Sequence, residues 1–194
     1  ENGRRNKIIT RVEAACKTGR QAYWVCTLIE ESEVLEAEAA AQTASSLELK
    51  LPEINIGLIH GQLKQAEKKE IMSSFVRGEI DLLVSTTVIE VGINIPNATV
   101  MVIENAERFG LTQLHQLRGR IGRGKDQGYC VLVQHKHSPD SNHRLKVMES
   151  TSNGFKSGLE ISGTMSILTT LLIYSNARSY SFGSYRCKVF IEFN

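Results

Sequence analysis

No stretch of this sequence approaches the roughly 18 consecutive apolar residues that a membrane-spanning helix needs. The polar start, residues 1–5, has the pattern of neither a signal peptide nor a transit peptide. The sequence therefore disfavours a membrane protein or a secreted protein. Because the first residue is Glu rather than Met, we expect the sequence to be a piece of a longer protein.

Cysteine is scarce, and charge of neither sign dominates. The four cysteines form no C-x-x-C pair and no Cys/His cluster with ligand spacing, so the sequence predicts no metal site. Reduced thiols of the cytoplasm are the preferred interpretation. Twenty-three basic and 21 acidic residues leave a net charge of +2, which is too small to identify a nucleic-acid-binding protein. Only the distribution of the charges can do so.

Apolar runs of strand length alternate with stretches of helical periodicity. The runs are continuous rather than alternating, which is typical of strands covered on both faces in a parallel sheet. The predicted strands are residues 22–28, 54–60, 81–86, 99–104 and 128–134. The predicted helices are residues 4–17, 31–50, 64–77, 111–117 and 142–150. This order predicts an α/β fold with an open, mostly parallel sheet flanked by helices.

The composition changes at about residue 155, where Ser, Thr, Gly and Tyr begin to dominate. We therefore divide the chain into a first domain, residues 1–154, and an unassigned extension, residues 155–194. The apolar stretches 165–174 and 186–193 lack a clear helical period. They are either strands or parts of a non-native or disordered extension.

The densest chemical signal is QLHQLRGRIGRG, residues 113–124. Arg118, Arg120 and Arg123 lie within six residues among three glycines, so several guanidinium groups can gather where the backbone approaches a ligand closely. One guanidinium group can bind two phosphate oxygens at once, through two parallel N–H···O hydrogen bonds. The alternative is a solvated basic helix end. Residues 119–126 also resemble a P-loop, but a helix precedes them, a strand follows them and Asp126 replaces the hydroxyl residue, so we reject that interpretation.

A second signal is STTVIEVGINIP, residues 85–96, which directly follows a predicted strand. Its hydroxyl residues occupy the carboxyl end of the strand, where open α/β sheets bind ligands. A turn or a helix cap is the alternative. Other prominent residues are assigned to packing: Tyr23, Trp24 and His115 to the core, and Glu90 and Glu104 to structural or interdomain contacts.

Together, these segments resemble the second RecA-like motor domain of superfamily 2 DNA helicases, and most of all the bacterial RecG family, with the transcription-repair coupling factor as the nearest competitor. The resemblance extends from about residue 4 to 154. His60–Gly61 and the helix after it match the "HG" segment, residues 85–98 match motif V, and residues 113–124 match motif VI. The resemblance implies a P-loop NTPase fold without its own P-loop.

The resemblance implies a nucleotide-facing set of residues. Arg120 and Arg123 would be catalytic, reaching across a cleft to ATP bound on a first motor domain, with Arg123 as the arginine finger. Gln116, Gly92 and Asn94 would bind the nucleotide. Many relatives carry Asp at the position of Asn94, which weakens the acceptor available for a ribose hydroxyl.

The resemblance also implies a DNA-binding set: Thr86 and Thr87 near the phosphate backbone, and His60 and Gly61 contacting or framing the same strand. The expected cofactor is ATP with Mg²⁺, held mainly by the first motor domain, and the expected partners are branched DNA, that first lobe and an N-terminal wedge domain. The implied activity is ATP-dependent remodelling of replication forks and Holliday junctions in bacterial recombination and repair. We expect this fragment alone to be inactive, because it lacks a P-loop and an Asp-Glu motif.

Residues 143–155 resemble the start of the helical hairpin that couples ATP hydrolysis to translocation. The acidic stretch and the arginine-glycine-proline-glycine segment expected after residue 155 are absent. A competing hypothesis comes from another class of protein: a non-catalytic nucleic-acid-binding module that keeps the RecA-like fold.

Overall fold

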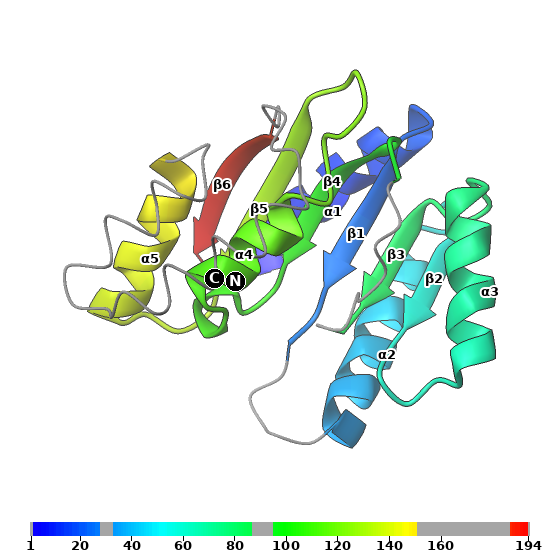
Figure 1. The fold of residues 1–194 in the computed structure, drawn as a ribbon, viewed down its shortest axis with the longest axis horizontal. Helices are drawn as coiled ribbons and strands as arrows, with labels where there is room; N and C mark the ends of the chain where they lie inside the picture. Colours follow the sequence, from blue (N-terminus) through cyan, green and yellow to red (C-terminus); the bar gives the residue numbers. More distant parts are fainter. Residues whose placement is uncertain (1, 28–32, 87–94, 151–186, 194) are drawn as a thin grey trace, which may run out of the picture.

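The computed structural model describes residues 2–27, 33–86, 95–150 and 187–193. A six-stranded sheet in the order β2-β3-β1-β4-β5-β6, with every neighbouring pair parallel, forms its centre (Figure 1). The strands are β1 Gln21–Val25, β2 Ile56–Ile59, β3 Leu82–Ser85, β4 Ala98–Ile103, β5 Gly128–Gln134 and β6 Cys187–Phe193. The predicted parallel sheet is confirmed.

Helices cover both faces of the sheet, and Figure 1 shows α4 in front of it and α1 behind it. The helices are α1 Asn2–Lys17, α2 Glu33–Lys50, α3 Gln65–Val76, α4 Leu111–Arg118 and α5 Pro139–Ser150, with a 3₁₀ turn η1 at Ala106–Arg108. The five predicted α-helices are confirmed to within a few residues at each end, whereas η1 was not predicted.

Successive residues of the central strands enter opposite cores, as the pleat of a strand requires. Tyr23 packs with α3, α4 and α5 on one face, and its ring meets Phe75 edge-on at a centroid distance of 5.0 Å. Trp24 packs with α1 and α2 on the other face and is fully buried. The assignment of both aromatic residues to the core is confirmed. Burial on both faces explains why these strands are continuously apolar in sequence.

Helix α1 is attached to the carboxyl end of the sheet by an ion pair. The Nη2 atom of Arg5 lies 2.8 Å from Oε1 of Glu104, the residue that follows β4, and the Arg5 guanidinium also lies over the Trp24 ring. This contact supports the structural role assigned to Glu104. Glu90 lies outside the described residues.

For the second of the two apolar stretches near the end of the chain, the structure decides between a strand and a disordered extension. Residues 187–193 form a strand that pairs in parallel with β5 over its whole length. Residues 165–174 lie outside the described residues. The division of the chain at residue 154 stays a prediction.

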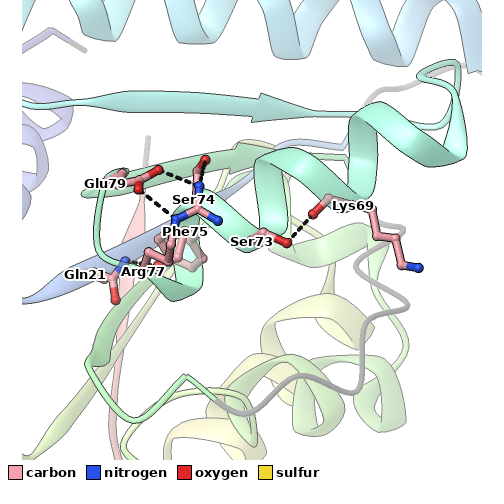
Figure 2. A network of polar contacts seen from close by, with 7 residues as sticks. All are labelled: Gln21, Lys69, Ser73, Ser74, Phe75, Arg77 and Glu79. Carbon is pink, nitrogen blue, oxygen red and sulfur yellow. Dashed lines mark hydrogen bonds and ion pairs between the residues drawn. The ribbon is translucent and has the colours of Figure 1, made fainter.

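Gln21 is a buried polar residue whose role the sequence did not indicate. Its amide Nε2 donates to the carbonyl oxygen of Phe75 and, at 2.8 Å, to that of Ile80, on either side of the turn that ends α3. In the same turn, the Arg77 guanidinium holds both carboxylate oxygens of Glu79 at 2.7 Å and the hydroxyl of Ser74 at 3.0 Å (Figure 2). The buried amide and the exposed ion pair thus fasten the same turn.

Replacing Gln21 with alanine is expected to lower the free energy of unfolding by about 2 kcal/mol, because the buried carbonyl group of Phe75 and the partly buried one of Ile80 lose their donor. Arg77→Ala is the matched control. It removes an exposed ion pair from the same turn and should change stability much less. Chemical denaturation of the two variants measures the difference. Equal losses in both variants would contradict the role assigned to the amide.

Candidate functional site

Helix α4 places the motif VI residues. The carbonyl oxygen of the Gln113 side chain accepts a hydrogen bond of 2.9 Å from the backbone N–H of Gly110, which satisfies one of the free donors at the helix start. Leu114 and Leu117 anchor the helix in the core. Beyond Arg118 the chain turns through residues 119–126, which we call the arginine loop. Gly122 has a φ of +67°, a backbone conformation that favours glycine.

The arginine loop presents Arg123 to solvent in a fixed orientation. Its Nε donates to the carbonyl oxygen of Gly119 at 2.6 Å, so the base of the guanidinium is tied to the start of the loop. Arg123 is exposed, as is Gln116 on α4, while Arg120 is half-buried. Gln116 belongs to α4, and Arg120 lies two residues beyond the end of that helix.

Electrostatics also places Arg120 and Arg123 together. Burial raises the pKa of Tyr23 to about 12, and the positive charges of Arg120 and Arg123 both oppose that rise. Both guanidinium groups therefore act on the same tyrosine on the α3–α4 side of the sheet. Guanidinium groups are well suited to bind phosphate oxygens.

Arg118, the third arginine of the stretch, does not share that surface. Its residue surface is only 5% exposed. Burial is the main influence on its pKa and lowers it, while the nearby thiols of Cys187 and Cys130 oppose the shift. The sequence could not separate Arg118 from its neighbours, because all three lie in the same glycine-rich stretch.

The predicted DNA-binding residues gather at a different place, which we call the DNA corner: His60, Gly61 and Thr86. Because β2 and β3 are parallel neighbours, His60 and Thr86 follow strands that end side by side. The N–H of Thr86 donates to the carbonyl oxygen of Ile59 at 3.2 Å. The side chain of Thr86 is buried, and His60 and Gly61 are half-buried. Thr87, Gly92 and Asn94 lie outside the described residues.

Lys68 is a neighbour of the DNA corner that the sequence analysis missed. Its Nζ donates to the carbonyl oxygen of Gly61 at 2.6 Å. The signal was present in the sequence, since Lys64, Lys68 and Lys69 follow shortly after the His60–Gly61 pair, at the start of the predicted helix. Two buried polar atoms at this corner, Nδ1 of His60 and Oγ of Ser85, have no hydrogen-bond partner within the part of the chain that the structure describes.

The DNA corner and the arginine loop lie at opposite ends of the sheet. The corner is at the carboxyl ends of β2 and β3, whereas the loop contacts the amino end of β4, where the N–H of Gly122 donates to the carbonyl oxygen of Ala98 at 3.2 Å. The candidate site therefore has two separate parts.

The ring of His115, a residue of α4, is packed against the rest of the protein, as the sequence analysis predicted. Both ring nitrogens are buried and have no hydrogen-bond partner among the described residues. Burial, helped by the positive charge of Arg118, lowers the pKa of His115 to about 4. The ring is therefore neutral at physiological pH and belongs to the packing of the motif VI helix.

In residues 2–27, 33–86, 95–150 and 187–193, no group of three His, Cys, Asp or Glu side chains is arranged to hold a metal ion. None of the helices in these ranges is long and apolar enough to cross a membrane.

Comparison with known proteins identifies a family and several relatives. The model of the helicase conserved C-terminal domain matches residues 5–125. The chain is 56% identical over 172 residues to the ATP-dependent DNA helicase RecG of Escherichia coli K12, and 46% identical over 152 residues to that of Bacillus subtilis. These matches cover 86% and 78% of this chain. They cover only 25% and 22% of the relatives, so the chain spans about a quarter of their length.

Solved structures agree with this result. A structure of RecG bound to a three-way DNA junction superimposes with a TM-score of 0.72 and 41% identity, covering 86% of this chain and 22% of that one. The DUF1998 helicase MrfA bound to DNA has a TM-score of 0.56 and 19% identity, covering 74% of this chain and 18% of that one. The second similarity shows the fold alone. The expected RecA-like fold is confirmed.

Proposed function

The chain belongs to the helicase conserved C-terminal domain family, and from this premise we propose that it is the second RecA-like lobe of an ATP-dependent motor that remodels branched DNA. The observation that carries the proposal is the arginine loop. Arg123 is exposed and held by its Nε, and Arg120 acts on the same tyrosine, yet the sequence contains no P-loop in the required context. An exposed guanidinium group, in a sequence without a phosphate-binding loop, fits a nucleotide held by another lobe.

In this mechanism, ATP is bound between two lobes. The first lobe supplies the P-loop and the Mg²⁺ ligands, and this lobe supplies Arg120, Arg123 and Gln116, with Gly92 and Asn94 assigned to the nucleotide by motif V. The positive charge of Arg123 stabilises the negative charge that spreads over the transferring phosphoryl group. The bond from its Nε to Gly119 leaves the two Nη groups for phosphate oxygens.

The DNA backbone contacts this lobe at the DNA corner. His60, Gly61 and Thr87 are assigned as its hydrogen-bonding groups, and Lys68 provides positive charge at Gly61. Thr86, whose side chain is buried, lies beside this contact and supports it. RecG relatives are bacterial DNA helicases, and one solved relative is bound to a three-way junction. We therefore assign branched DNA in the bacterial cytoplasm as the substrate, and recombination and repair as the process.

Nucleotide-dependent DNA binding tests this proposal. In the intact gene product, the affinity for a synthetic three-way junction is expected to change when a non-hydrolysable ATP analogue is added, because closure of the lobes rearranges the DNA contacts. A salt titration in the presence and absence of the analogue measures the effect. If the DNA affinity falls log-linearly with salt and is the same with and without the nucleotide analogue, the result would instead support the non-catalytic binding module.

A further inference from the structure

The arginine loop is seated on the turn that leads into β4, and one glycine permits the contact. A Cβ atom added to Gly124 would lie 2.6 Å from the carbonyl oxygen of Pro96 and 3.4 Å from its carbonyl carbon. Real Cβ atoms essentially never come within 3.0 Å of another heavy atom. Because the obstacle is backbone, it cannot rotate away as a flexible side chain would. Any side chain at position 124 must therefore push the loop off the turn.

The requirement for glycine here is spatial rather than conformational. Gly124 is not among the described glycines with positive φ, whereas Gly122 is. Gly122 fixes the loop from the other side of Arg123 through its bond to Ala98. Arg123 thus lies between two contacts with the start of β4, and its Nε is bonded to Gly119 in the same loop. A displacement at Gly124 is transmitted directly to the neighbouring arginine.

The turn beneath Gly124 leads directly into β4. Pro96 and Asn97 form this turn, and β4 begins at Ala98, the residue whose carbonyl oxygen accepts the hydrogen bond from the N–H of Gly122. The loop that carries Arg123 therefore rests on a turn that is joined to the central sheet.

We propose that Gly124 is a positioning residue, which holds Arg123 in place against the turn that leads into β4. The inference rests on the proposed function. Gly124 contacts neither nucleotide nor DNA in this account. It acts through Arg123, by letting the arginine loop rest directly on the backbone of Pro96.

The test uses Gly124→Ala in the intact gene product. Its kcat for DNA-stimulated ATP hydrolysis is expected to fall about 10- to 100-fold, since a displacement of roughly 1 Å is enough to cost this much. The KM for ATP and the affinity for junction DNA should stay unchanged, because the P-loop lobe and the DNA corner are untouched. Gly110→Ala is the matched control: its new Cβ meets only the Gln113 side chain, at an ordinary 3.6 Å.

A double variant separates positioning from general destabilisation. If Gly124 acts through Arg123, adding Gly124→Ala to Arg123→Ala should lower kcat no further. A further 10-fold loss in the double variant, or an unchanged kcat in Gly124→Ala, would overturn the inference. Normal turnover in Arg123→Ala alone would instead overturn the proposed function, so the two failures are distinguishable.

A second substitution covers the case in which Gly124→Ala does not fold. Pro96→Gly keeps the carbonyl group that Gly124 meets but frees the φ angle that the proline ring fixes, so the support of the loop becomes more mobile without an added atom. Thermal unfolding verifies that the variant is folded. It is expected to lower kcat in the same way and to have no effect in the Arg123→Ala background. A folded Pro96→Gly variant with normal kcat would overturn the inference.

Discussion

Arg123→Ala in the intact gene product is expected to lower DNA-stimulated ATP hydrolysis about 10³-fold or more and to retain binding of junction DNA. The reason is the separation of the two parts of the site. Arg123 belongs to the loop at the amino end of β4, whereas the proposed DNA contacts lie at the carboxyl ends of β2 and β3. Removing the guanidinium should therefore affect the phosphoryl-transfer step and leave DNA binding intact.

Two further variants make this prediction specific. Arg123→Lys keeps the charge but loses the planar fork, so it should restore only part of the turnover. Arg11→Ala is the control, because Arg11 is an exposed arginine on α1, on the opposite face of the sheet from α4. Steady-state ATPase rates at saturating DNA measure all three variants. Near-normal turnover in Arg123→Ala would contradict the assignment of Arg123 as the arginine finger.

Acid is expected to destabilise this lobe through His115. The pKa of His115 is lowered to about 4 in the folded chain, from an ordinary value of 6.5. The unfolded chain therefore binds a proton first as the pH falls, and stability is lost between pH 6.5 and pH 4. The linkage relation gives a loss of about 3 kcal/mol once both states are protonated, and no loss from this residue above pH 7.

Comparison with His115→Leu isolates this contribution from that of the carboxyl groups. The difference in unfolding free energy between the two proteins should change by about 3 kcal/mol between pH 7 and pH 4, in favour of the leucine variant at low pH. Thr112→Ala, at an exposed position of the same helix that carries no ionisable group, is the control and should follow the parent protein. Parallel pH profiles for the parent and His115→Leu would contradict this prediction, because the ring would then take up its proton as readily in the folded chain as in the unfolded chain.

The strands of this fold were predictable because the same pattern, a short and continuous apolar run, marks each central strand in the sequence. Each central strand is buried on both faces, so residues such as Tyr23, Trp24 and Val102 had to be apolar without alternation. Gln21 was not predictable as a core residue. Its burial depends on two carbonyl groups more than 50 positions away in sequence. The strand at Cys187–Phe193 had no flanking pattern to distinguish it from an extension.

The candidate site was predictable in its residues but not in its arrangement. The motifs named Arg120, Arg123, His60 and Thr86, and those assignments stay proposals. That Arg118 is buried could not be read from a stretch in which all three arginines look alike. The contact of Gly124 with Pro96 was equally hidden, because it joins two motifs through backbone atoms and depends on no side-chain pattern.

The central claim is that this lobe contributes Arg123 to ATP held on another lobe. A structure of the intact gene product with a three-way junction and a γ-phosphate mimic tests it most directly. The account predicts an Nη atom of Arg123 within hydrogen-bonding distance, about 2.7–3.2 Å, of the mimic, whose remaining contacts come from the first lobe. A nucleotide bound without Arg123, with the guanidinium directed away from it, would contradict the claim.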